Sequence, residues 1–198
     1  MGSQMIALFC VDPHPVVAAG LAAIAAADPA LEFAGAARDG ESAIAALVES
    51  RADLVLMDAA LLGPDGFALC RRVKAAAPGA RVVVYTDTAW STGIALQARV
   101  AGADGLIDKG TEGPELLEAL RAIDAGALAL PPLRPGELEA AAQRVEPGDL
   151  ALLAMLADRT PPSDVADTLR IDSRGVLRRI DRLLPRLSGL SGRKPHPA

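Results

Sequence analysis

Apolar runs alternate with alanine-rich stretches over the first two thirds of the chain. The runs lie at about 6–11, 31–36, 53–57, 81–85 and 104–107. Between them, apolar residues recur at helical spacing, as in the series Val17, Leu21 and Ile24. Five strands that alternate with five helices predict βαβ units. The expected fold class is α/β, a doubly wound five-stranded parallel sheet with helices on both faces.

A proline-bearing segment, LALPPLRPGE, interrupts this alternation between Leu128 and Glu137. Such a cluster of proline and glycine marks a loop, so a domain boundary is expected there. The opening MGSQ is typical of a vector remnant and is left out of the first domain. We predict a first domain over 5–126, a linker with a short helix over 127–144, a second domain over 145–190 and a flexible tail over 191–198.

Three apolar stripes at helical spacing follow the linker. They consist of Leu150, Leu153, Ala154 and Ala157, then Val165, Ala166 and Leu169, then Val176, Ile180, Leu183, Leu184 and Leu187. Three short helices joined by tight turns predict a small all-α helix-turn-helix domain. Pro185 is expected to end or kink the third helix early.

Composition restricts the compartment and the partners. Of 198 residues, 51% are hydrophobic and 23% are charged, which is typical of a globular protein. The longest apolar stretch, 16–27, is far shorter than the roughly 20 residues of a membrane span, so no membrane partner is expected. Cys10 and Cys70 lie in apolar surroundings and are interpreted as buried thiols in a reducing compartment. The expected location is the cytoplasm.

The net charge of −5 is distributed unevenly. Residues 1–130 carry 9 basic and 16 acidic residues, whereas 173–194 carry seven basic residues and only Asp181 as an acid. Arg174, Arg178 and Arg182 repeat every fourth residue on the third predicted helix, with Arg179 alongside. Such an array predicts contacts with double-stranded DNA. None of the five aromatic residues lies in this segment, which argues against base stacking on single strands. The alternative is an ordinary solvated helix face.

Four polar residues stand where predicted strands end, namely Asp12, Asp58, Thr86 and Lys109. The carboxyl ends of parallel strands meet at one edge of a sheet, so these residues are expected to build one pocket. A carboxylate that attacks a phosphoryl group needs a cation to offset charge repulsion, and a lysine can hold the charge that develops. The alternative is that these residues only cap strand ends.

Several classes of enzyme are excluded by missing motifs. The sequence contains no G-x-G-x-x-G and no G-x-x-x-x-G-K-[ST], so a dinucleotide site or a P-loop lacks its phosphate-binding backbone. An aspartyl phosphatase would need a second acid two residues after Asp58, where Ala60 stands. We therefore expect that the protein is not an enzyme.

The first domain resembles the receiver domain of bacterial response regulators. The resemblance rests on Asp12, Asp58, Thr86 and the segment GADGLIDK ending at Lys109, together with Asp65-Gly66. It implies a flavodoxin-like fold in which Asp58 accepts a phosphoryl group from a histidine kinase or a small phosphodonor. It also implies a Mg²⁺ ion held by Asp12, Asp58 and Ala60, with Thr86 and Lys109 as phosphoryl contacts.

Three positions depart from the family pattern. Pro13 replaces the second acid that usually contacts the metal, so Mg²⁺ is expected to bind more weakly. Leu62 and Leu106 replace a proline and the aromatic residue whose movement accompanies activation. His14, beside Pro13 in the mouth of the pocket, is interpreted as a loop residue rather than a catalytic base. A regulator that does not depend on phosphorylation, and uses this domain for dimerisation or ligand sensing, therefore stays an alternative.

The second domain resembles the LuxR-type helix-turn-helix of the NarL/FixJ class of response regulators. The matches include Pro147, Asp149, Val165-Ala166, Leu169, Ile171, Val176, Ile180, Leu184 and Leu187. Gly175 replaces a threonine that commonly meets the DNA backbone. The combined resemblance implies a DNA-binding transcriptional regulator that works as a homodimer, because one small helix-turn-helix buries little surface. The alternative is a protein-interaction module that does not bind DNA.

Overall fold

The computed structural model describes residues 5–62, 67–87, 89, 91 and 93–188. Five parallel strands form one sheet in the order β2-β1-β3-β4-β5. They are β1 (Ile6–Val11), β2 (Leu31–Ala37), β3 (Leu54–Met57), β4 (Arg81–Thr86) and β5 (Gly105–Asp108). The strand order reverses between β1 and β3, which is the place where a ligand crevice opens in a doubly wound sheet. The predicted fold class of the first domain is confirmed.

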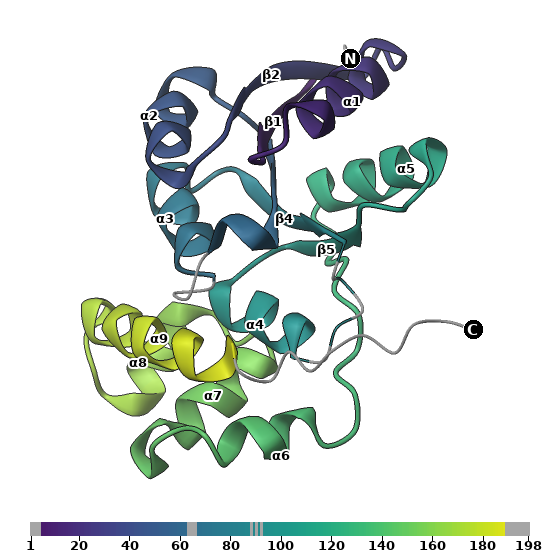
Figure 1. Cartoon of the computed structure of the whole chain (residues 1–198). Coiled ribbons are helices and arrows are strands. Elements are labelled where there is room, and N and C mark those ends of the chain that lie inside the picture. The colour runs from purple at the N-terminus through teal and green to yellow at the C-terminus, as the bar shows by residue number, and fades with distance from the viewer. Residues whose placement is uncertain (1–4, 63–66, 88, 90, 92, 189–198) are drawn as a thin grey trace.

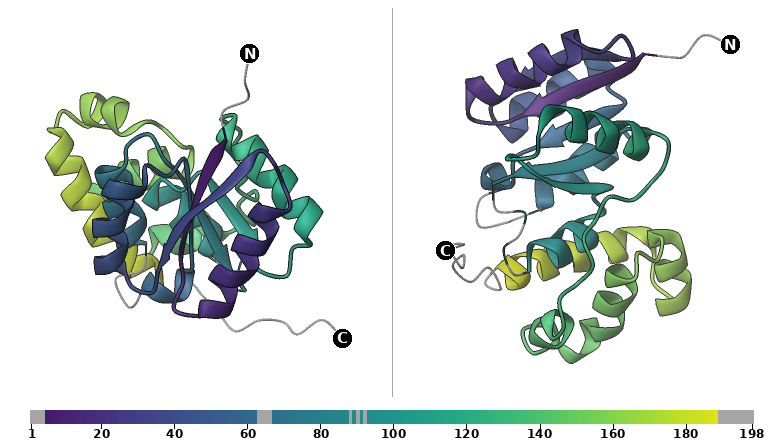
Figure 2. Two further views of the ribbon diagram at one scale, coloured as in Figure 1. Left: turned by 90° about the horizontal axis from the view of Figure 1, so that it is seen from above. Right: turned by 90° about the vertical axis from the view of Figure 1, so that its right-hand side faces the viewer.

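Helices cover both faces of this sheet (Figures 1 and 2). Helices α1 (Pro15–Ala26) and α5 (Gly113–Asp124) pack on one face, over a cluster that contains Leu8, Leu56 and Leu120. Helices α2 (Gly40–Ser50), α3 (Ala68–Ala76) and α4 (Ile94–Ala101) pack on the other face. Because both faces are covered, β3 and β4 are apolar along nearly their whole length.

Both cysteines lie within this core. Cys10 and Cys70 are free and buried, as expected from their apolar neighbours. Burial raises the pKa of each thiol to about 12. Both side chains therefore stay protonated near neutral pH and behave as small apolar residues.

Four helices follow the sheet: α6 (Glu137–Ala142), α7 (Leu150–Ala157), α8 (Pro162–Leu169) and α9 (Ser173–Ser188). Short 3₁₀ turns, η1 (Ala59–Leu62) and η2 (Pro147–Asp149), precede α3 and α7. The stripe predicted for α9 is buried throughout. The stripe predicted for α7 was partly wrong, because Leu150 is 41% exposed and Leu152 and Leu156 lie in the core instead.

Pro185 was expected to end or kink the last helix early, and it does not end it. Helix α9 continues through Pro185 to Ser188. A proline inside a helix removes one backbone hydrogen bond and costs about 3 kcal/mol. Leu183, Leu184 and Leu187 on the same turns are fully buried, and this burial offsets the cost.

Helix α4 packs against both parts of the chain. Ile94, Leu96, Ala98 and Val100 are among its buried residues, because the sheet lies on one side and α7 and α9 lie on the other (Figure 1). A single hydrophobic cluster therefore runs from β1 through α4 into α9. The two predicted domains share a core across α4.

Some residues named in the sequence prediction lie outside the part of the chain that the structure describes. Asp65-Gly66 and the tail over 191–198 lie outside the described residues. The domain limits at 126, 144 and 190 stay predictions. Across the described residues, no helix combines the length and apolar character needed to cross a membrane.

Candidate functional site

Asp12 and Asp58 lie side by side at the carboxyl edge of the sheet. Strands β1 and β3 are paired with Val11 opposite Met57, so the next residue of each strand is an aspartate. The Asp58 N–H donates to the Val11 carbonyl at 2.9 Å. The two side chains are only 2% and 4% exposed. Two buried carboxylates at one point repel one another and require a nearby cation.

Lys109 supplies that cation. Its Nζ donates to Asp12 Oδ2 at 2.6 Å and to Asp58 Oδ2 at 2.9 Å. Burial by itself lowers the pKa of Lys109, but the hydrogen bonds and charges of the two carboxylates outweigh it and raise the pKa above the ordinary value. The ammonium stabilises the fold fully below the ordinary lysine pKa of about 10.4, and this contribution is lost as the pH rises through the raised value.

Thr86 reaches the same edge at the end of β4. It is 1% exposed and lies opposite Asp108 in the register of β4 and β5. Its carbonyl accepts the Lys109 N–H at 3.1 Å, so the backbone joins the two predicted phosphoryl contacts. Ala60 follows Asp58 within η1. The structure thus brings Asp12, Asp58, Thr86 and Lys109 to one edge.

His14 lies at the mouth of this pocket, where the sequence interpretation placed it as a loop residue, and it also contacts Asp12. It is the N-cap residue of α1, and its N–H donates to Asp12 Oδ1 at 2.8 Å. Its Nδ1 lies 3.1 Å from the same oxygen. One donor atom each from Asp12, His14 and Asp58 fall within 4.8 Å of one another. The signal was the PHP triplet, because Pro13 and Pro15 restrict the backbone on both sides of His14.

The oxygen and nitrogen donors of this pocket fit a divalent cation, and the nitrogen donor changes which metal the pocket favours. Asp12 and Asp58 offer carboxylate oxygens, which suit Mg²⁺ and Mn²⁺. Pro13 offers no ligand, whereas the imidazole of His14 lies next to it. Imidazole favours metals later in the first transition row over Mg²⁺. The residues present can therefore hold a divalent cation, and the nitrogen donor distinguishes this pocket from an all-oxygen site.

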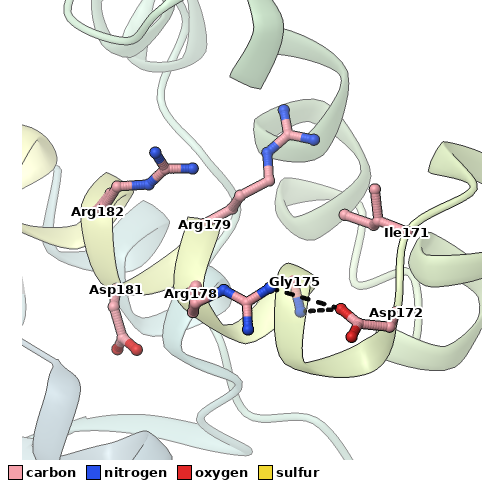
Figure 3. A pocket seen from close by; sticks show the side chains of 7 residues that line it. All are labelled: Ile171, Asp172, Gly175, Arg178, Arg179, Asp181 and Arg182. Atoms are coloured by element: carbon pink, nitrogen blue, oxygen red, sulfur yellow. Dashed lines mark hydrogen bonds and ion pairs between the residues drawn. The ribbon is translucent and has the colours of Figure 1, made fainter.

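The exposed face of α9 carries the predicted DNA contacts. Arg174, Arg178 and Arg182 are all exposed. Arg178 and Arg182 line a shallow depression with Gly175, in which Arg179 and Arg182 point away from the side that carries Asp181 (Figure 3). The array predicted from the fourfold spacing is thus accessible to solvent.

Asp172 lies beside the glycine at position 175. Its Oδ1 accepts the Gly175 N–H at 2.6 Å and caps the first turn of α9 (Figure 3). A Cβ at Gly175 would lie 2.8 Å from that oxygen. That oxygen ends an exposed and flexible side chain that can shift, so the contact by itself does not require glycine. Arg178 lies 3.7 Å from the same carboxylate, an exposed pair that leaves its side chain 69% exposed.

Arg179 differs from the other three arginines. Its Nε donates to Asp149 Oδ1 at 2.6 Å, and its Nη2 donates to the Gly148 carbonyl. The Asp149 carboxylate is 9% exposed, so this pair is largely buried. Arg179 joins α9 to the start of α7, and its guanidinium is already bound within the protein.

One flank of α9 is held by the sheet-containing part of the chain. Arg71 on α3 donates to the Leu177 carbonyl at 2.7 Å and lies 2.9 Å from an Asp181 carboxylate oxygen. A helix that enters the major groove needs free space on its flanks, because the groove is about 12 Å wide. In this arrangement, α3 and α4 occupy that space beside Leu177 and Asp181.

Comparison with known proteins agrees with this architecture. The model of the response regulator receiver domain family matches residues 8–121. The DNA-binding transcriptional activator DevR/DosR of Mycobacterium tuberculosis is 30% identical, over 92% of this chain and 88% of its own. The nitrate/nitrite response regulator NarL of Escherichia coli is 25% identical, over 91% and 88%.

Solved structures show the same fold. A LuxR-family two-component response regulator from Aurantimonas sp. SI85-9A1 is 30% identical, covers 72% of this chain and all of its own, and has a TM-score of 0.58. RcsB of Salmonella typhimurium, at 19% identity, covers 95% of this chain and 99% of its own with a TM-score of 0.58. Because the family model spans more than half of the sequence and DevR/DosR aligns over nearly all of it, this chain belongs to the response regulators of the NarL and LuxR class.

Proposed function

We propose that this protein is a DNA-binding transcriptional regulator in which phosphorylation of Asp58 controls the access of α9 to DNA. The observation that carries the proposal is the position of α4. It packs on the sheet that ends in the Asp58 pocket and also against α9, which bears the exposed arginines. A change at the pocket can therefore reach the DNA-binding helix through packed contacts.

The pocket residues have distinct roles in this proposal. An Asp58 carboxylate oxygen attacks the phosphorus of a phosphohistidine or an acyl phosphate, and the bond from phosphorus to the donor breaks. Asp12, His14, Asp58 and the Ala60 carbonyl would hold a divalent cation, which would supply charge neutralisation when bound. Lys109, already 2.9 Å from Asp58, pairs with the phosphoryl oxygens. The Thr86 hydroxyl donates to one of them.

The phosphoryl group also supplies the force for the switch. It adds between one and two negative charges and three strong acceptors to a buried edge. Thr86 and Lys109 then reorient toward the new oxygens, and the segment from β4 to α4 follows. Movement of α4 weakens its packing on α9 and the contact of Arg71 with Asp181. The freed α9 then enters the major groove with Arg174, Arg178 and Arg182.

The partners follow from this chemistry. Double-stranded DNA is the target, a histidine kinase is the phosphodonor, and the cytoplasm is the location where both are found together. We propose a homodimer as the active form, because two half-sites double the contact surface of a small helix-turn-helix.

Phosphorylation is tested with acetyl phosphate and Mg²⁺ or Mn²⁺ on the full chain. We expect a phosphoprotein by mass spectrometry, no modification of Asp58→Asn, and full modification of the control Asp158→Asn, whose aspartate is exposed far from the pocket. We also expect phosphodonor to raise the affinity for duplex DNA at least about tenfold, a coupling of about 1.4 kcal/mol. Phosphorylation of the Asp58→Asn variant to the same extent as the wild type would contradict the assignment of Asp58 as the phosphoacceptor.

One alternative has its own structural support. Lys109 already pairs with both Asp12 and Asp58, and Pro13 removes an acidic ligand, so the repulsion between the carboxylates is reduced without a phosphoryl group. A regulator of this kind would bind DNA with equal affinity as wild type and as Asp58→Asn, in the presence or absence of phosphodonor. Equal affinities in this comparison would favour the phosphorylation-independent function.

His14→Ala is expected to change which metal the pocket prefers. Removal of the imidazole should weaken Zn²⁺ binding about tenfold or more and alter Mg²⁺ binding much less, because Mg²⁺ relies on oxygen ligands. Isothermal titration on the full chain measures both affinities. Val16→Ala, an exposed change on the same helix, serves as the control. Equal losses for Mg²⁺ and Zn²⁺ would instead assign His14 to positioning Asp12.

A further inference from the structure

A cavity of about 500 Å³ lies where the two parts of the chain meet. Its walls come from α3, α4, α7, α9 and the residues that follow α4 and α7. Leu156, Pro161, Leu177 and Ile180 form part of an apolar surface. This volume lies within the range of roughly 300–1,000 Å³ that is typical of small-molecule sites. The pocket of Asp58 and the arginine face of α9 are separate from this surface.

Four basic residues and a single acid line the same cavity. They are Arg71, Lys74, Arg99, Arg159 and Asp104. Asp104 is already engaged, because its carboxylate accepts Lys74 Nζ at 2.6 Å and the Val82 N–H at 2.7 Å. Arg71 pairs with Asp181. Two guanidinium groups are therefore left, those of Arg99 and Arg159.

Within the described part of the chain, Arg99 and Arg159 have no carboxylate within 4.0 Å and bind carbonyl oxygens instead. Arg99 donates to Ala157 at the end of α7 and to Pro131, at 3.4 and 3.0 Å. Arg159 donates to Ala103, just beyond the end of α4. Each arginine thus reaches the carboxyl-terminal end of a helix in the other part of the chain, where the partial charge is negative.

The two arginines also disfavour one another. Burial lowers the pKa of Arg159; the charge of Asp104 opposes this lowering, and the charge of Arg99 adds to it. The Nε atoms of Arg71 and Arg99 are buried without a hydrogen-bond partner among the described residues. Buried donors without acceptors are unfavourable, and so are like charges in partly apolar surroundings. An anion in the cavity would relieve both conditions.

We propose that this cavity binds a small amphipathic anion, a carboxylate or phosphate monoester with a short apolar chain, whose charged group bridges Arg99 and Arg159. The chain of the ligand lies against the apolar surface that contains Leu156 and Ile180. Because the walls come from both parts of the protein, the ligand binds the closed arrangement and stabilises it. The expected effect of this ligand on DNA binding rests on the proposed function, whereas binding of the ligand to the cavity does not.

Direct binding is tested on the full chain by isothermal titration and thermal shift. The probes are decanoate, decyl phosphate, inorganic phosphate and decyltrimethylammonium. We expect saturable binding of one molecule of decanoate or decyl phosphate per chain, at least tenfold weaker binding of inorganic phosphate, and none of the cation. The first two probes distinguish a carboxylate ligand from a phosphate ligand. Equal binding of the cation, or of inorganic phosphate, would overturn the proposal.

Variants assign the binding to the cavity. Arg99→Gln and Arg159→Gln should each weaken the amphipathic anion at least tenfold, whereas Arg99→Lys should retain most of the affinity. Arg144→Gln, an exposed arginine outside the cavity, is the matched control. Each glutamine variant is first checked for a native melting transition. If Arg99→Gln and Arg159→Gln both retain the affinity for the amphipathic anion, the assignment of binding to this cavity is wrong.

A DNA measurement separates this proposal from the proposed function. Decanoate should lower the affinity of the wild type for duplex DNA, and Arg99→Gln should remove that effect. If titration shows that decanoate binds the cavity but decanoate leaves the DNA affinity unchanged, the proposed coupling between the cavity and DNA binding is wrong. If the protein does not bind DNA at all, the proposed function fails while the calorimetric result on the cavity stands.

Discussion

Replacement of Arg174, Arg178 and Arg182 together by alanine is expected to weaken binding to duplex DNA at least about a hundredfold at physiological salt. The three arginines are exposed and recur every fourth residue, which places them on one face of α9. Each phosphate that a protein cation neutralises releases counterions. The loss of three contacts should therefore reduce the steepness of log affinity against log salt concentration by about 2.7. Arg179 is left unchanged, because it binds Asp149 and Gly148.

Fluorescence anisotropy with a labelled duplex of mixed sequence, at several salt concentrations, measures both quantities. The chain is assayed with and without phosphodonor, because the closed arrangement holds one flank of α9. Arg72→Ala, an exposed arginine on α3, is the matched control and should bind as the wild type does. If the triple variant keeps its affinity and salt slope, α9 is not the DNA-binding surface. If the wild type shows no DNA binding in any condition, the protein-interaction module becomes the better account.

Replacement of Lys109 by methionine is expected to lower the free energy of unfolding by about 3–5 kcal/mol. Lys109 Nζ is the cation that joins Asp12 and Asp58, and both carboxylates are nearly fully buried. Its removal leaves two like charges facing one another with little solvent. At about 2–4 °C per kcal/mol for a chain of this size, the melting temperature should fall by roughly 10 °C.

Urea unfolding followed by circular dichroism measures the change. Asp58→Asn in the Lys109→Met background removes one of the two charges and should restore a substantial part of the lost stability. Divalent cations should also raise the melting temperature of Lys109→Met more than that of the wild type, because the ion replaces the missing positive charge. A Lys109→Met protein as stable as the wild type would show that the carboxylates do not depend on this lysine.

The sheet and its edge could be predicted because they depend on local pattern. Short continuous apolar runs and alanine-rich stretches with apolar residues at helical spacing are separate signals, and their alternation leaves few topologies. The expected strands differ from the observed ones by only one residue at any end. Asp12, Asp58, Thr86 and Lys109 converge because each directly follows or ends a parallel strand, which topology alone requires.

Local pattern was misleading where packing decided the outcome. Pro185 does not end α9, because the leucines around it are buried in a core that the sequence of one helix cannot display. Spacing grouped Arg179 with its neighbours, but Asp149 lies thirty residues earlier and only the fold brings the two together. His14 was expected at the mouth of the pocket as a loop residue, and its contact with Asp12 is visible only in the fold.

The sequence by itself therefore determined the α/β sheet, the ends of its strands, the helical arginine array and the family. Only the tertiary structure decided that α4 is buried between the sheet and α9, that Arg71 holds Asp181, and that Arg99 and Arg159 line one cavity. The physical reason is the range of the interactions. Secondary structure and strand ends follow from neighbours a few residues apart, whereas these contacts join residues that lie roughly 60 to 110 positions apart and form only when two packed units meet.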